Sequence, residues 1–84
     1  MAHIMSLKEA VNYSLEHLTQ TNVAKLLGVT VNQVYKYSTG DTKSCRDNVV
    51  DAIFDNLDVD GEPILLDYFK DEEQYLKFRS IREQ

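Results

Sequence analysis

Residues 20–40 carry the feature that most constrains the fold, because the small residue Ala24 stands four positions before Gly28. Glycine adopts the left-handed backbone that ends a helix. A small side chain one turn earlier lets a second helix cross the first closely, at about a right angle or a little more. The segment therefore predicts one short helix, which Thr19, Gln20 or Thr21 can cap and which ends at Gly28. It predicts a second helix that is capped by Thr30 and ends at Gly40.

Capping pairs predict further helices on both sides of this segment. Ser6 and Glu9 match a capping box, which predicts a helix over about residues 7–18. Ser44 and Asp47 form a similar pair at the start of a fourth helix. These helices and the two between them predict a compact helical bundle.

The chain after Leu57 is harder to assign. Residues 58–61 have the composition of a turn. Residues 62–69 fit either a helix that opens with Pro63 or a buried strand, because three consecutive apolar residues show no period. We favour the helix, and we expect Asp71 to cap a last one.

With 84 residues, the chain has room for one domain only. We expect an all-α fold, a four- to five-helix bundle over residues 6–57 with an acidic C-terminal helical extension over residues 58–84. Residues 1–5 contain a second methionine, Met5, and are interpreted as a cloning remnant ahead of the native start.

The segment from Gln20 to Gly40 resembles the helix-turn-helix of the phage repressor and Cro family, and the resemblance extends over about residues 7–57. It implies a lambda-repressor-like fold whose shared core includes Val23, Leu27, Val29, Val34 and Tyr37. It also implies a sequence-specific transcriptional regulator, a phage or prophage repressor that binds a palindromic DNA operator in the cytoplasm of a bacterial or phage-infected cell. The alternative left open is a protein-binding module, such as an antirepressor, that uses the same fold with an acidic surface.

In the geometry of this family, the amino end of the third helix enters the major groove. The amides of Asn32 and Gln33 can pair two-pronged with adenine, and Lys36 can donate to guanine or to phosphate. The expected base-reading residues are Thr30, Val31, Asn32, Gln33, Tyr35 and Lys36. The residues expected to contact phosphate are Gln20, which matches a phosphate-binding glutamine of the family, Thr21, Asn22, Lys43 and Arg46.

The net charge of −5 opposes DNA binding, since affinity for the duplex comes largely from neutralised phosphates. The charge is unevenly distributed, however: residues 1–50 carry +1 and residues 51–84 carry −6. Residues 20–46 alone carry four basic side chains and one acidic one, a balance of +3. The acidity therefore lies away from the expected reading helix.

Aromatic and apolar side chains are numerous in the C-terminal extension and must be buried. They can pack within the chain, onto the first and fourth helices, or they can form a homodimer interface that sets two reading helices about one DNA turn apart. We favour a homodimer, at least on DNA. Its expected interface residues are Tyr68, Phe69, Tyr75, Phe78 and Ile81.

The sequence contains no motif for several classes of function. The one cysteine, Cys45, allows neither a disulfide nor a cysteine-based metal cluster, and no nucleophile motif indicates an enzyme. The acidic residues between Asn56 and Asp67 match a calcium loop poorly. No apolar run approaches a membrane span. We therefore expect no catalytic residue, metal, cofactor, small-molecule substrate or membrane contact.

Overall fold

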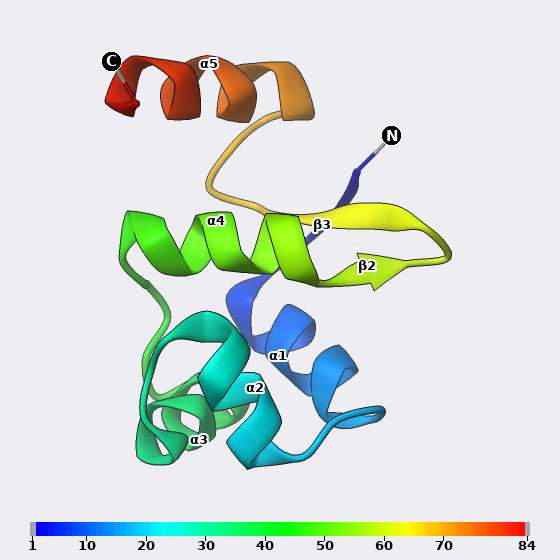
Figure 1. The fold of residues 1–84 in the computed structure, drawn as a ribbon, viewed down its shortest axis with the longest axis vertical. Helices are drawn as coiled ribbons and strands as arrows, with labels where there is room; N and C mark the ends of the chain where they lie inside the picture. The colour runs from blue at the N-terminus through cyan, green and yellow to red at the C-terminus, as the bar shows by residue number, and fades with distance from the viewer. Residues whose placement is uncertain (1, 84) are drawn as a thin grey trace.

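The computed structural model describes residues 2–83, which form five helices and three short strands. Figure 1 shows α2 and α3 at one end of the long axis and α5 at the other, with α4 between them. Met1 and Gln84, which belong to the first and last predicted segments, lie outside the described residues. The elements in chain order are β1 (His3–Met5), α1 (Leu7–Leu15), α2 (Gln20–Leu27), α3 (Val31–Thr39), α4 (Asp47–Asn56), β2 (Asp58–Val59), β3 (Glu62–Leu66) and α5 (Glu72–Arg82).

Side-chain caps begin four of the five helices of residues 2–83, α4 being the exception. The Ser6 hydroxyl accepts the N–H of Glu9 at 3.1 Å, and the Glu9 carboxylate accepts the N–H of Ser6 at 3.2 Å, so the capping box of α1 is complete. The hydroxyls of Thr19 and Thr30 accept the N–H groups of Asn22 and Gln33 at the starts of α2 and α3, and the Asp71 carboxylate caps α5. Each cap satisfies a backbone donor that the helix itself leaves open.

The turn between α2 and α3 follows from Gly28, which has the left-handed φ of 69°. The N–H of Val29 donates to the carbonyl of Ala24 at 3.0 Å, a pattern that closes a helix over a left-handed residue. Thr30 then caps α3, so only three residues separate the two helices. Gly40, also left-handed, ends α3 as predicted.

Two predicted helix ends are wrong. The first helix ends at Leu15 rather than at residue 18. Its Ser14 hydroxyl donates to the carbonyl of Ala10 at 2.9 Å, a bond that competes with the helical pattern. The predicted cap of α4 by Ser44 is also wrong, because the helix begins later, after Arg46, and no side chain caps it.

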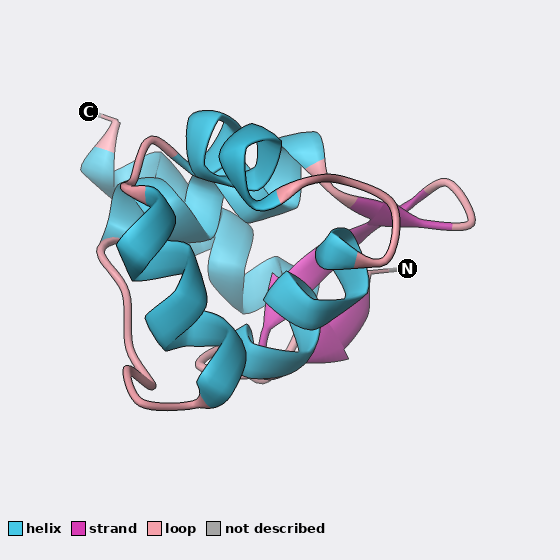
Figure 2. Cartoon of the chain, turned by 90° about the horizontal axis from the view of Figure 1, so that it is seen from below, coloured by secondary structure: helices cyan, strands magenta, loops and turns pink. Residues whose placement is uncertain are grey.

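The all-α class is too narrow, because the mostly helical chain contains a three-stranded sheet of order β1-β3-β2. β1 pairs parallel with β3, with His3 opposite Ile64, and β2 pairs antiparallel with it. In Figure 2 the strands, in magenta, lie to one side of the helices. The predicted helix over residues 62–69 is therefore wrong, and residues 3–5, expected to precede the folded chain, form part of the sheet.

The physical reason for the strand is that Ile64, Leu65 and Leu66 are all fully buried. A run of three residues buried on every side suits the central strand of a covered sheet, whereas a surface helix needs a polar face. The preceding turn is held by Asp60 and Gly61, both left-handed, as two-residue hairpins require. β3 therefore belongs to the main core, which α5 also enters through Tyr75, and α5 is the only helical part of the predicted extension within residues 2–83.

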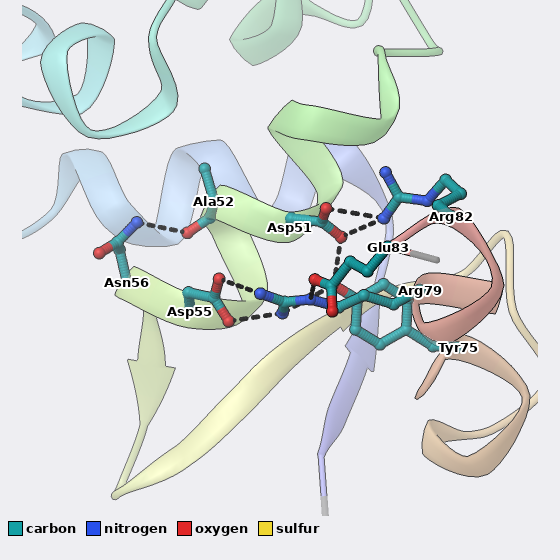
Figure 3. A network of polar contacts seen from close by, with 8 residues as sticks. All are labelled: Asp51, Ala52, Asp55, Asn56, Tyr75, Arg79, Arg82 and Glu83. Atoms are coloured by element: carbon teal, nitrogen blue, oxygen red, sulfur yellow. Dashed lines mark hydrogen bonds and ion pairs between the residues drawn. The ribbon is translucent and has the colours of Figure 1, made fainter. Parts of the chain in front are cut away.

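α5 is fastened to α4 mainly through side chains, as Figure 3 shows. Arg79 donates to both carboxylate oxygens of Asp55 at 2.7 and 2.8 Å, and Arg82 donates to both oxygens of Asp51 at 2.7 Å. The hydroxyl of the fully buried Tyr75 also donates to Asp51. These bonds tie the acidic face of α4 to the basic face of α5.

Candidate nucleic-acid interface

α3 buries one face and leaves the other open. Its inward side chains, Val34 and Tyr37, are 0% and 4% exposed. Burial raises the pKa of Tyr37, which therefore stays neutral in the core. The helix is also tied to α1, because the Asn12 amide donates to the carbonyl of Ser38 at 2.9 Å. The outer face of α3 is therefore held on a rigid support.

All six residues expected to read bases lie on or beside this outer face of α3. Val31 and Tyr35 are 41% and 56% exposed, and Thr30 and Asn32 are exposed as well. Gln33 and Lys36 are half-buried. The Thr30 hydroxyl accepts the N–H of Gln33 as the helix cap, but its own proton remains available for donation.

The residues expected to contact phosphate lie on two segments. Gln20, Thr21 and Asn22 are exposed in the first turn of α2. Lys43 and Arg46 are exposed in the loop between α3 and α4. Backbone donors at the amino end of a helix attract anions, so the first turn of α2 has chemistry that suits phosphate.

A hollow of about 250 Å³ brings two of the predicted classes together. It lies between the α2–α3 turn and the start of α4, and both Gln33 and Arg46 line it. A second hollow of about 310 Å³ lies beside the loop between α3 and α4, and Lys8 and Lys43 are among its lining residues. The amino half of the chain thus collects cations around the loop that follows α3.

The basic side chains of α5 and those of the amino half differ in their partners. Within residues 2–83, Lys77, Arg79 and Arg82 on α5 are paired with carboxylates. In the same part of the chain, no ion pair engages the five basic residues of the amino half, which are Lys8, Lys25, Lys36, Lys43 and Arg46. These five cations are therefore free to meet an external anion.

The acidic C-terminal region differs in both position and electrostatics. Burial alone would raise the pKa of Asp51, but hydrogen bonds from Arg82 and Tyr75 and the charge of Arg79 outweigh it, and the pKa lies below its ordinary value. This carboxylate therefore stays ionised and engaged with α5. α5 also lies at the end of the molecule opposite α3 (Figure 1).

The residues expected to form a dimer interface are divided by the structure. Tyr75 is fully buried and Phe69 is half-buried, with ring centroids 5.2 Å apart, and the Phe54 ring of α4 lies 4.8 Å from Tyr75. Tyr75 and Phe69 thus pack within the chain, and Tyr75 is not accessible to a partner. Tyr68, Phe78 and Ile81 remain 44%, 37% and 72% exposed.

Two contacts near the loop between α3 and α4 could not be predicted from the sequence. Lys8 reaches the end of α3, where its Cδ lies 3.3 Å from the position that a Cβ on Gly40 would occupy. The Tyr68 hydroxyl donates to the carbonyl of Lys43 at 2.8 Å. Both contacts join residues far apart in the chain, and neither follows from local spacing.

Comparisons with protein-family models, curated proteins and solved structures return no match for the chain. Over residues 2–83, no helix is both long enough and apolar enough to cross a membrane. The same residues contain no group of three histidine, cysteine or acidic side chains placed to hold a metal ion.

Proposed function

We propose that the protein is a sequence-specific DNA-binding regulator in which α2 and α3 act as a helix-turn-helix and α3 reads the major groove. The observation that carries the proposal is the one-sided burial of α3. Val34 and Tyr37 fix the helix, while Val31, Asn32 and Tyr35 project from its free amino half. A helix held in this way can place base-reading side chains in the groove without rearranging its core.

The distribution of charge supports this proposal. The free cations of the amino half are available for phosphate, whereas the arginines of α5 already neutralise carboxylates of α4. Because α5 lies at the far end of the molecule, its acidic side chains are held away from a duplex bound at α3 (Figure 1). Neutralised phosphates supply most of the non-specific affinity of such proteins, so we expect that affinity to be low here.

Selection from a random duplex library, followed by titration of the selected site at several salt concentrations, tests the proposal. Lys36→Ala should weaken binding at every sequence or relax one base position, and Lys70→Ala, an exposed lysine beside α5, serves as its matched control. Asn32→Ala should lose about 1 to 3 kcal/mol of discrimination at one base pair with folding intact. Failure of the intact chain to enrich any sequence would remove the proposed function.

We also propose that two copies bind one palindromic site, with their α3 helices about 34 Å apart, one turn of DNA. Exposed apolar side chains at the α5 end, Phe78 and Ile81, support a contact between copies. Sedimentation of the chain with and without the selected duplex measures the stoichiometry, and Ile81→Ser tests the contact. One copy per full site, or unchanged stoichiometry in Ile81→Ser, would contradict it.

The second candidate, a protein-binding module, is favoured by one observation. Leu26, Val31 and Tyr35 on α2 and α3 are large apolar side chains that are 38%, 41% and 56% exposed. Protein interfaces use exposed apolar and aromatic residues of this kind. The library selection separates the two functions, because a module that binds only protein enriches no DNA sequence.

A further inference from the structure

The hydroxyl of Tyr68 forms a long-range contact with the loop between α3 and α4. Tyr68 lies in the segment between β3 and α5, and its hydroxyl donates to the carbonyl of Lys43, 25 positions away, at 2.8 Å. The thiol of Cys45, a half-buried residue of the same loop, lies beside this hydroxyl. The C-terminal part of the chain therefore contacts the middle of the loop.

The loop has a second tether on its other side. The N–H of Thr42 donates to the carbonyl of Lys36 at 3.2 Å, which folds the start of the loop back on α3. The bond to Tyr68 follows at the next residue, Lys43, and α4 begins after Arg46. The backbone is thus held from α3 on one side and from Tyr68 on the other.

The side chains on this held backbone remain open. Lys43 and Arg46 are exposed and form no ion pair within the described residues, and Arg46 reaches the hollow that it shares with Gln33. A cation on a mobile loop loses conformational freedom when it meets a phosphate, and a loop ordered beforehand avoids much of that loss. The tethers therefore hold the backbone that carries these two free cations.

We propose that Tyr68 is a positioning residue for DNA binding, one that orders the Lys43–Arg46 loop so that both cations face the phosphate backbone next to α3. This inference rests on the proposed DNA-binding function. It gives Tyr68 a role inside one copy of the chain rather than between two copies. It also links residues 67–71, which lead into α5, to the DNA-facing end of the molecule.

The test is Tyr68→Phe, which keeps the ring and removes the hydroxyl. Because the substitution removes one of the two hydrogen bonds that hold the loop, affinity for the selected duplex should fall about threefold to tenfold, and the dependence of affinity on salt should become shallower. Amide hydrogen exchange should accelerate within residues 42–46, while exchange in the helices stays as in the parent chain. Tyr13→Phe, whose hydroxyl has no partner within residues 2–83, is the matched control and should behave as the parent.

The outcomes separate this inference from the function on which it rests. Parent affinity in Tyr68→Phe, or unchanged exchange in residues 42–46, would overturn the positioning role while DNA binding stands. Faster exchange throughout the chain would make Tyr68 a general stabilising residue and would also overturn it. A parent chain that selects no duplex would remove the DNA-binding function and this inference together.

Discussion

Replacement of Asp51 by asparagine tests how α5 is held on α4. The Asp51 carboxylate accepts two bonds from Arg82 at 2.7 Å and one from the hydroxyl of Tyr75. The amide of Asp51→Asn keeps the shape of the side chain but has only one oxygen, and its NH₂ group faces donors. At least one of the three bonds is therefore lost, together with the charge that attracts Arg82.

The expected cost follows from burial and from the number of partners. The side chain of Asp51 is 21% exposed, and bonds to a charged group contribute about 1.5 to 3 kcal/mol each when they are sheltered. Screening by solvent reduces this, so we expect a loss of about 1 to 2 kcal/mol in the free energy of unfolding. Asp55→Asn, whose carboxylate is 44% exposed, is the matched control and should cost about 0.5 kcal/mol or less.

The pH dependence gives the prediction a sign. The folded pKa of Asp51 lies below the ordinary value of 3.8, so its contribution is fully present above that value and is lost as pH falls through the folded pKa. Urea unfolding followed by circular dichroism should show a gap between parent and Asp51→Asn at neutral pH that closes in strong acid. Equal costs for Asp51→Asn and Asp55→Asn, or a gap that persists in strong acid, would refute the reasoning.

Three further predictions concern the turn, the core and the loop. Gly28→Ala should lower the free energy of unfolding by about 1 kcal/mol in thermal unfolding, because the φ of Gly28 is +69°, although no atom lies within 4 Å of the new Cβ. Gly28→Asn should cost less, and an alanine variant as stable as the parent would contradict this. Leu65→Ala should cost about 2 to 5 kcal/mol, whereas the 45% exposed Leu76 should tolerate alanine within about 0.5 kcal/mol; equal costs would place β3 outside the core. Burial, with the nearby Cys45, raises the pKa of Tyr68 to about 12, so the hydrogen bond from its hydroxyl to the loop should persist above pH 10 and be lost near pH 12. The difference in tyrosinate absorbance between the parent and Tyr68→Phe measures the ionisation of Tyr68, and ionisation near pH 10 would contradict the prediction.

The helices around α3 could be predicted because their signals are local. Ser6 with Glu9, Thr19 and Thr30 each cap a backbone group within three residues, and Gly28 acts on its own φ. Such interactions need no knowledge of the rest of the fold. The exposed face of α3 is what the resemblance to the helix-turn-helix family implies, and the reading residues expected from it lie on or beside that face.

The sheet could not be predicted in the same way, because it joins the two ends of the chain. His3 pairs with Ile64, and no local pattern near either residue reveals the other. One local signal was present, since Asp60 followed by Gly61 is typical of a two-residue hairpin turn. Pro63 leaves the segment after this turn ambiguous, because proline suits the first turn of a helix as well as the start of a strand.

The placement of the C-terminal aromatic residues also depends on contacts between distant elements. A buried Tyr75 and a half-exposed Tyr68 look alike in sequence, and each becomes distinct only through its partner, Asp51 on α4 or Lys43 in the loop. The sequence predicts that such side chains are buried but leaves open whether they are buried by the same chain or by a second copy. The structure supplies that cover for Tyr75 and Phe69 and leaves Ile81 exposed.

The pairing of cations sets an upper limit on the salt dependence of the proposed DNA binding. Six basic residues are free of ion pairs within residues 2–83, the five of the amino half and Lys70, whereas Arg79 and Arg82 are engaged by α4. Each phosphate neutralised lowers the slope of log affinity against log salt by about 0.9, so the six free cations of one copy allow a slope of about −5.4 at most. A steeper slope per copy would require cations released from the α4–α5 pairs, and Asp51→Asn, which loosens Arg82, would then steepen it further. An unchanged slope in that variant, with a parent slope within the limit, is what the separation of α5 from the reading face predicts.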